Sequence, residues 1–344
     1  MAKKAKTAAR IKSRSRSVPV VDTHTHIIIP DVWALTKKHS LPARTGAGSD
    51  NLSATNIGQD KTMLRMTDAK TRIKDMDRMG IDMQVISPSL VHQESYWASP
   101  KKGLAIDQLS NQRMAEYVSA YPDRFAGIGS VPLQDGKLAA KELDRLVNRL
   151  GLRGVSISTQ VGKLELGDKS LWPFWRKAEK LGVPVFVHPA GNDDRRMHRF
   201  GFAFTLAQPW EEAMAMASLV YDGIMDKFPK VKIQIAHGGG YLPYYSGRLD
   251  NGYAQMRKRG QATKLKHKFS GYLKKFYYDS VIFDVDMLEF LTSKIPAGRV
   301  MMGTDYPFGE TRPIQFVRKS KKLSRADKDA ILGGTATKLF RLGT

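Results

Sequence analysis

The stretch VPVVDTHTH at residues 18–26 begins the pattern that decides the fold. It is a short run of β-branched residues that ends in two histidines, His24 and His26, spaced two apart. In a β-strand, residues i and i+2 point to the same face. Two imidazoles on one face could hold one metal ion together. Two solvated histidines just past a strand are the alternative that this stretch alone leaves open.

Short apolar runs of the same kind recur along the whole chain. Each is rich in Val, Ile or aromatic residues, and most are separated by stretches whose apolar residues have helical spacing. Strands that alternate with helices predict βαβ units and a parallel sheet. The eight runs are residues 18–24, 81–87, 125–131, 152–158, 183–189, 231–237, 276–282 and 300–306.

Eight such repeats favour a closed (β/α)8 TIM barrel over an open doubly wound sheet, and no GxGxxG motif follows the first run. The helices between the runs are predicted within residues 70–80, 103–122, 136–151, 171–182, 211–229, 285–296 and 325–343. Residues 30–69 break the rhythm with a mixed polar composition. We expect them to form a long insertion after strand 1, over the carboxyl-terminal mouth of the barrel.

Composition limits the function classes. The chain has 344 residues and no cysteine, which excludes disulfides, thiolate catalysis and cysteine-bound zinc. Its net charge is +23, with seven basic residues in the first 16. We expect a disordered basic tail at residues 1–17 and a single catalytic domain at 18–344. No nucleic-acid motif accompanies the basic runs, and no apolar stretch is long enough for a membrane helix, so we expect a cytoplasmic protein with anionic small-molecule substrates.

Half of the eight histidines, and one aspartate, lie at the carboxyl ends of the predicted strands. In a barrel these ends converge on one pocket. Imidazole and carboxylate ligands suit a borderline divalent ion, which can lower the pKa of bound water, and a nearby histidine can move protons near neutral pH. His237 is the best candidate for that role, and the glycines after it are expected to let substrate approach the backbone closely. The residues are His24, His26, His188, His237 and Asp305.

Four motifs, in this order, resemble the amidohydrolase superfamily: VDTHTH (21–26), FVHP (186–189), IAHGGG (235–240) and GTDYPFG (303–309). The resemblance is greatest to its decarboxylase branch, typified by the aminocarboxymuconate semialdehyde decarboxylases. It runs from about residue 20 to 340 and includes SYWASP (95–100), YPDRFAGIGSVPLQ (121–134), LGVPVFVHP (181–189) and DKFPKVKIQIAHGGGYLPYYSGRLD (226–250).

The resemblance implies roles for individual residues. It implies that His24, His26, His188 and Asp305 bind a single divalent metal, most simply zinc, with manganese as the other possibility. His237 is implied as the catalytic acid or base, with Asp305 assisting. Arg248 matches an arginine that reaches a substrate carboxylate across a dimer interface, so a homodimer is expected; a surface ion pair is the alternative for this arginine.

The sequence also departs from the family. Ala190 stands where the semialdehyde decarboxylases have a tryptophan, and Arg65 cannot be aligned securely with their second substrate-binding arginine. The run at 152–158 contains no lysine for a carboxylated bridge, which argues against a binuclear hydrolase site.

We therefore expect a metal-dependent non-oxidative decarboxylase of an unsaturated or aromatic carboxylic acid, of the muconate semialdehyde or hydroxybenzoate type. A hydrolase or hydratase on the same fold is the first alternative, acting on a lactone, an amide or an enol acid. A non-enzymatic basic scaffold is the second, and the complete set of five site residues argues against it.

Overall fold

The computed structural model describes residues 18–39, 61–88, 95–191, 194–262 and 264–343. The predicted tail at residues 1–17 and the middle of the predicted insertion lie outside these residues. Each of the eight predicted runs contains a strand, and these strands pair in parallel. They are β1 (Val21–Ile27), β2 (Met83–Pro88), β3 (Phe125–Gly127), β4 (Val155–Ile157), β7 (Pro184–Val187), β8 (Lys232–Ile235), β9 (Tyr277–Asp279) and β10 (Val300–Met301).

The strands form two parallel sheets, one in the order β1-β2-β3 and one in the order β10-β9-β8-β7-β4. Single parallel bridges join them at both ends, between Gly129 and Val155 and between Thr25 and Tyr306. The prediction is thus confirmed as an α/β fold with parallel sheets, whereas the ladders do not run as one continuous closed sheet. A small antiparallel hairpin of β5 (Gln160–Val161) and β6 (Leu164–Glu165) follows β4 and was not predicted.

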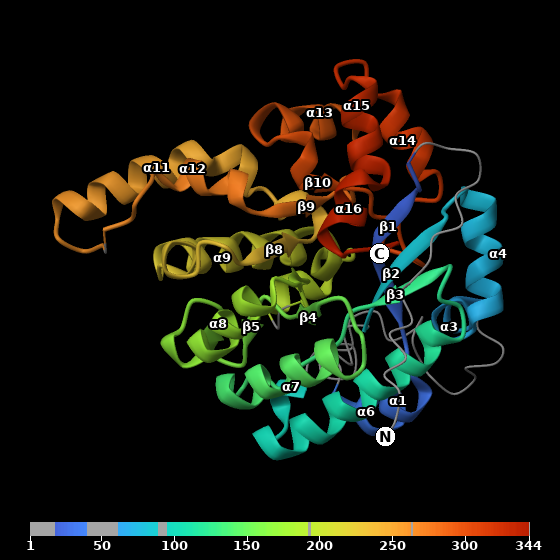
Figure 1. Cartoon of the computed structure of the whole chain (residues 1–344). Coiled ribbons are helices and arrows are strands. Elements are labelled where there is room, and N and C mark those ends of the chain that lie inside the picture. Colours follow the sequence, from blue (N-terminus) through green and yellow to red (C-terminus); the bar gives the residue numbers. More distant parts are fainter. Residues whose placement is uncertain (1–17, 40–60, 89–94, 192–193, 263, 344) are drawn as a thin grey trace.

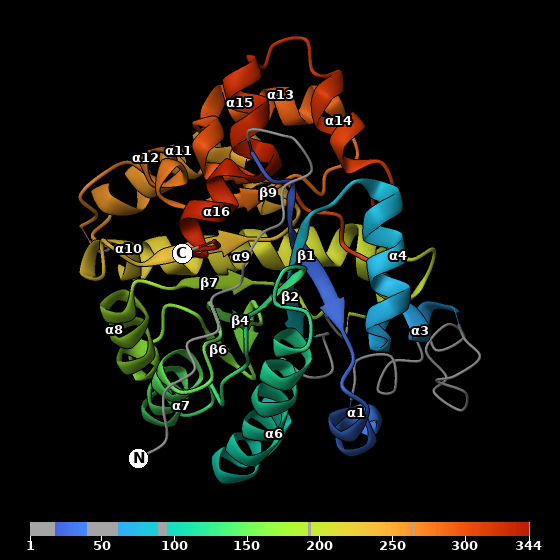
Figure 2. The same cartoon turned by 45° about the vertical axis from the view of Figure 1, so that its right-hand side comes forward.

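Helices lie outside the strands in both views (Figure 1, Figure 2). Their apolar sides pack on the strands, and the largest core cluster combines buried residues of both layers. The longer helices are α4 (Ala69–Met79), α6 (Pro100–Ser119), α7 (Gly136–Asn148), α8 (Trp172–Leu181), α9 (Gln208–Tyr221), α11 (Leu242–Lys258) and α13 (Val285–Lys294). The shorter ones are α1 (Pro30–Thr36), α3 (Lys61–Thr67), α10 (Ile224–Lys227), α12 (Phe269–Tyr272), α14 (Pro313–Lys319), α15 (Arg325–Asp329) and α16 (Thr335–Leu339).

Local sequence signals explain where these helices begin and end. The side chain of Asp68 accepts a hydrogen bond from the backbone N–H of Thr71 at the start of α4, and Gly80 ends that helix in the left-handed conformation. Asp135 caps α7 in the same way, and Gly182 ends α8 with a positive φ. Short polar caps and glycine stops therefore return the chain to the next strand within a few residues.

A second core cluster lies between the two sheets. Its buried apolar side chains come from strands of both sheets, from residues directly after them, and from α16 and the residues that follow it, so the sheets share one interior. They include Val21, Met83, Val85, Ala126, Ile128, Phe186, Ala236 and Met301. Packed side chains fill the interior at this level, which leaves the carboxyl ends of the strands as the place for polar chemistry. No helix in the described part of the chain combines the length and apolar character needed to cross a membrane.

Candidate metal centre

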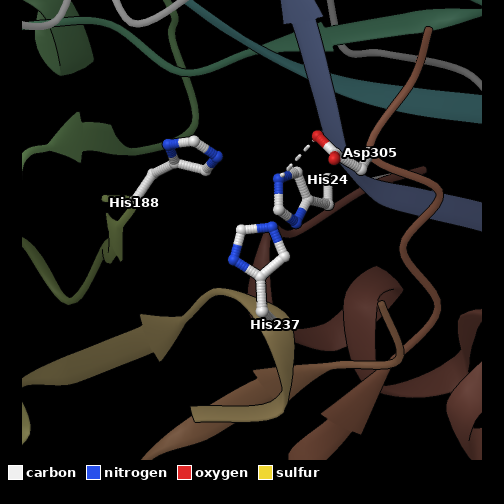
Figure 3. A group of neighbouring side chains, drawn as sticks. All are labelled: His24, His188, His237 and Asp305. Carbon is white, nitrogen blue, oxygen red and sulfur yellow. Dashed lines mark ion pairs between the residues drawn. The ribbon is translucent and has the colours of Figure 1, made fainter. Parts of the chain in front are cut away.

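Four predicted site residues meet at the carboxyl ends of the strands. His24 comes from β1 and His188 directly follows β7, while His237 and Asp305 lie in the loops after β8 and β10. Each offers one ligand atom, and these atoms all lie within 4.8 Å of one another. Figure 3 shows the three imidazoles and the carboxylate pointing toward a common centre, although they come from segments far apart in the chain.

His26, the other histidine of the pair, lies at the edge of the same group. Its Nε2 is 3.0 Å from Oδ1 of Asp305, and its ring centroid is 4.7 Å from that of His188. His24 Nε2 is 3.4 Å from the same carboxylate oxygen of Asp305. The structure therefore brings all five predicted residues together, with Asp305 facing both histidines of β1.

The backbone at two of these residues is left-handed, which is uncommon outside glycine. φ is 48° at His237 and 58° at Asp305. Both residues lie in the loops that follow β8 and β10, where the chain leaves the sheet. Strained backbone of this kind clusters at functional sites.

The turn at His237 requires the glycines that follow it. A Cβ on Gly238 would lie 2.6 Å from the Ile282 side chain, and one on Gly240 would lie 2.2 Å from the backbone oxygen of Pro209. Real Cβ atoms do not approach so closely, and both glycines have positive φ. These glycines therefore let the His237 turn pack against the protein, and the expectation that they also let substrate approach the backbone stays a prediction.

Carboxylates outside the cluster hold two of the imidazoles. Nδ1 of His24 lies 2.7 Å from Oδ2 of Asp279, the last residue of β9, and both side chains are fully buried. Nδ1 of His237 is hydrogen-bonded to Oε1 of Glu212 on α9. Such partners fix the orientation of a histidine and leave its Nε2 for a metal or a substrate.

These two acids were missed in the sequence. Glu212 lies at the start of a helix, where an acidic residue is common, but it is fully buried against His237. Asp279 lies in a predicted strand without a histidine, so only the fold places it beside His24. Asp22, also buried beside the site, accepts hydrogen bonds from Gln84 and from both the backbone and the hydroxyl of Thr304.

Burial and the neighbouring charges shift the pKa values of the group in opposite directions. Burial alone lowers the pKa of His24, but the Asp279 and Asp305 carboxylates outweigh it and raise this pKa to about 10. Burial among other imidazoles holds the pKa of His188 well below its usual range, and burial also lowers that of His26. Burial opposes ionisation of Asp305, but the two histidines of β1 hold its pKa well below the ordinary value. The ionised carboxylate of Asp305 therefore faces imidazoles, of which those of His26 and His188 are neutral.

The donor set fits a single divalent ion. Nε2 of His24 is buried, faces the cluster and makes no hydrogen bond among the described residues, while Oδ1 of Asp305 lies 3.4 Å away as its charged neighbour. Neutral imidazoles with one carboxylate suit zinc or manganese and do not suit a soft-metal site. The structure thus supports one divalent metal site, without distinguishing the ion.

Arg248 is not part of this group. It lies on α11, which projects away from the strands with α12 in both views, and its side chain is exposed. Within this single chain the predicted substrate-binding role therefore has no counterpart.

Known proteins resemble the chain over nearly its whole length. A 2-amino-3-carboxymuconate-6-semialdehyde decarboxylase of Dictyostelium discoideum is 32% identical over 335 residues, covering 94% of this chain and 91% of the relative. A 2-keto-4-carboxy-3-hexenedioate hydratase of Sphingobium is 26% identical, covering 83% and 82%.

Solved structures agree with this similarity. A 5-carboxyvanillate decarboxylase from Sphingomonas paucimobilis has a TM-score of 0.83 and 26% identity, covering 95% of this chain and all of that one. A dihydroxybenzoic acid decarboxylase from Polaromonas, with bound manganese and the inhibitor 2-nitroresorcinol, has a TM-score of 0.79 and 25% identity, covering 95% and 98%. A sequence model of the amidohydrolase family matches residues 21–342, and with the 32% identical relative it shows that the chain belongs to this family.

Proposed function

We propose that the protein is a metal-dependent decarboxylase that removes CO2, without oxidation, from an unsaturated or aromatic carboxylic acid. The observation that carries the proposal is the meeting of His24, His188, His237 and Asp305 within 4.8 Å at the strand ends. The decarboxylases among the similar proteins support this reaction and this substrate class.

The fold proposal follows from the same strands. Residues 18–344 would form one catalytic domain in which the eight parallel strands make a (β/α)8 barrel. The two bridges between the sheets and their shared apolar interior support closure. Residues 30–69 would insert after strand 1; the structure describes their ends as α1 and α3.

His24, His26, His188 and Asp305 would hold the metal ion. Zinc was expected from the sequence, but the manganese in the Polaromonas enzyme makes manganese an equal candidate here. When bound, a divalent ion would stabilise negative charge on the substrate as a Lewis acid. Asp279 would keep the His24 imidazole oriented through Nδ1.

His237 would manage the proton. Decarboxylation breaks the bond between the carboxylate and a ring or alkene carbon, CO2 leaves, and the electron pair stays on that carbon until it takes up a proton. The hydrogen bond from Nδ1 to Glu212 leaves Nε2 of His237 for this transfer. Burial lowers the pKa of His237, but the Glu212 carboxylate outweighs it and raises this pKa, which favours the protonated imidazole that a general acid needs.

A homodimer would give Arg248 its role. We propose that this exposed arginine of α11 reaches the substrate carboxylate in the second copy of the chain, where its guanidinium can bind two oxygens at once. The first turn of α11 and the residue before it carry three exposed tyrosines, which a second copy would cover: Tyr241, Tyr244 and Tyr245.

Hydration or hydrolysis at the same centre is the second candidate, favoured by the Sphingobium hydratase. Product analysis separates the two. The metal-loaded protein is incubated with 2,6-dihydroxybenzoate, 5-carboxyvanillate and 2-amino-3-carboxymuconate-6-semialdehyde, and both CO2 and product mass are measured. Loss of the mass of CO2 from one of these acids, abolished in His237→Ala, is the expected result. Gain of the mass of water without CO2 release would replace the proposal by the hydratase.

A further inference from the structure

Two adjacent glutamates at the start of α9 point to different strand ends of the site. Oε2 of Glu211 accepts hydrogen bonds from the hydroxyl of Thr159 and from the backbone N–H groups of Ala190 and Gly191, just after His188. Glu212, the next residue, turns instead to His237 after β8. One helix start therefore contacts the loops of two neighbouring site histidines.

We propose that Glu212 is the positioning residue that fixes His237 for proton transfer. It would hold the imidazole with Nδ1–H toward α9 and Nε2 toward the metal donors. The chemical part of this proposal rests on the function proposed above, because it assumes that His237 moves the proton.

Among the described residues, the side chain of Glu212 hydrogen-bonds to His237 alone. Its side chain is fully buried, and Oε1 bonds Nδ1 of His237. Oε2 has no hydrogen-bond partner among the described residues. Burying a carboxylate with half of its acceptor capacity unused is costly, so a role at His237 is the explanation that the contacts allow.

The packing around the pair removes other orientations. A Cβ at Gly240 would lie 3.2 Å from Oε2 of Glu212 and 2.2 Å from the backbone oxygen of Pro209, so the His237 turn lies directly against the start of α9. The ring of His237 is also confined on the other side, where its centroid is 5.0 Å from that of His24. Any residue larger than glycine at position 240 would thus block the space in which Glu212 meets the imidazole.

In its ionised form the Glu212 carboxylate can only accept hydrogen bonds, and this fixes the tautomer of His237. Nδ1 must carry the hydrogen, so neutral His237 has its lone pair on Nε2, and the protonated ring can give a proton from Nε2. A glutamine can instead donate its amide N–H to Nδ1, which would place the hydrogen of neutral His237 on Nε2 and remove its basic atom.

The test reads the ring nitrogens directly. Protein labelled with 15N-histidine is loaded with zinc, which is diamagnetic, and long-range 1H–15N spectra are recorded; His237→Ala identifies the His237 signals. We expect a protonated Nδ1 in the wild type and its loss, or exchange with Nε2, in Glu212→Gln. Glu179→Gln is the control, because Glu179 is half-buried on α8 and its side chain accepts a hydrogen bond from the backbone N–H of Lys230, away from the site.

Turnover supplies the second readout. In Glu212→Gln, kcat is expected to fall by about 10²-fold or more, within the range that general acid–base catalysis supplies, with little change in KM. Glu212→Asp keeps the carboxylate and should recover part of the loss. An unprotonated Nδ1 in the wild type, or a Glu212→Gln protein with unchanged spectrum and kcat, would overturn the proposal.

The spectra and the turnover measurements distinguish a failure of the positioning role of Glu212 from a failure of the proposed function. If the spectra show the expected tautomer but no acid releases CO2, the proposed function is wrong while the positioning by Glu212 stands. If CO2 release depends on His237 but not on Glu212, the proposed function stands and the positioning is wrong.

Discussion

The guanidinium of Arg72, fully buried on α4, donates a hydrogen bond from Nη2 to the backbone carbonyl oxygen of His26. Its Nη1 donates to Oε1 of Gln84 at 3.1 Å, and its plane lies 4.7 Å from the ring centroid of Tyr306. Since Tyr306 follows Asp305, one buried cation supports both the strand end and the loop that carry metal donors.

Replacing this guanidinium should therefore loosen the metal site. For Arg72→Met we expect metal affinity to fall by about 10–100-fold, as when other residues that orient metal ligands are changed. We also expect a loss of about 3 kcal/mol in the free energy of unfolding, because the buried groups lose their hydrogen bonds. Chelator competition and urea denaturation measure the two effects.

Arg78→Met on the same helix is the matched control. Arg78 is exposed and pairs with Asp75 on the same helix, so its removal should change stability by less than about 0.5 kcal/mol. Equal effects of the two substitutions would show that Arg72 does not support the donors.

Asp279 should set the affinity of the centre through His24. Asp279→Asn keeps the shape of the side chain but removes the charge that faces Nδ1 of His24 at 2.7 Å. We expect metal affinity to fall by about 10–100-fold. The exposed Asp286, on α13, provides the control Asp286→Asn, which should bind metal like the wild type. Metal affinity that is equal in both variants would exclude Asp279 as a support of the centre.

The buried carboxyl of Asp107 should make the free energy of unfolding depend on pH, independently of the metal. Burial on α6 raises the pKa of this carboxyl well above 3.8, despite hydrogen bonds from Ser95 and Ser130. Above about pH 4 the unfolded chain releases a proton that the folded chain still holds, so this group lowers the free energy of unfolding as pH rises.

Asp107→Asn removes this decrease in the free energy of unfolding at higher pH. Its stability relative to the wild type should rise by about 1.4 kcal/mol per pH unit from pH 4 until the folded pKa of Asp107 is reached. Urea denaturation of both proteins at pH 5 and pH 8 checks this. A stability difference that is the same at both values would be inconsistent with a raised pKa.

Arg248 should act in the other subunit. If so, Arg248→Ala and His237→Ala chains are each inactive alone, whereas a mixed dimer contains one intact site, with His237 from one chain and Arg248 from the other. Mixing the two variants under conditions that allow subunit exchange should therefore restore CO2 release. A mixture as inactive as its components would place both residues in the same subunit or remove Arg248 from the site.

The strands and the convergence of the site residues could be predicted because their signals are local. All eight predicted runs contain strands, and the residues after them converge as a parallel fold requires. The helix α11 was not predicted, since its first half is rich in Tyr, Gly and Pro and it projects from the fold rather than packing an apolar stripe.

The supporting residues could not be found in this way. Asp279, Glu212 and Arg72 act on residues that are 255, 25 and 46 positions away in the chain. Nothing in their own neighbourhood distinguishes them from surface charges. Only the packing that buries them reveals which histidine each one holds.

The most direct test measures bound metal and CO2 release on the same preparation, before and after chelation and in His188→Ala. We predict one divalent ion per chain and CO2 release from one of the three acids named above. Both should be lost together on chelation or in the variant, and readdition of zinc or manganese to the chelated wild type should restore both. CO2 release by the metal-free protein, or an absence of metal that reconstitution does not remedy, would contradict the account.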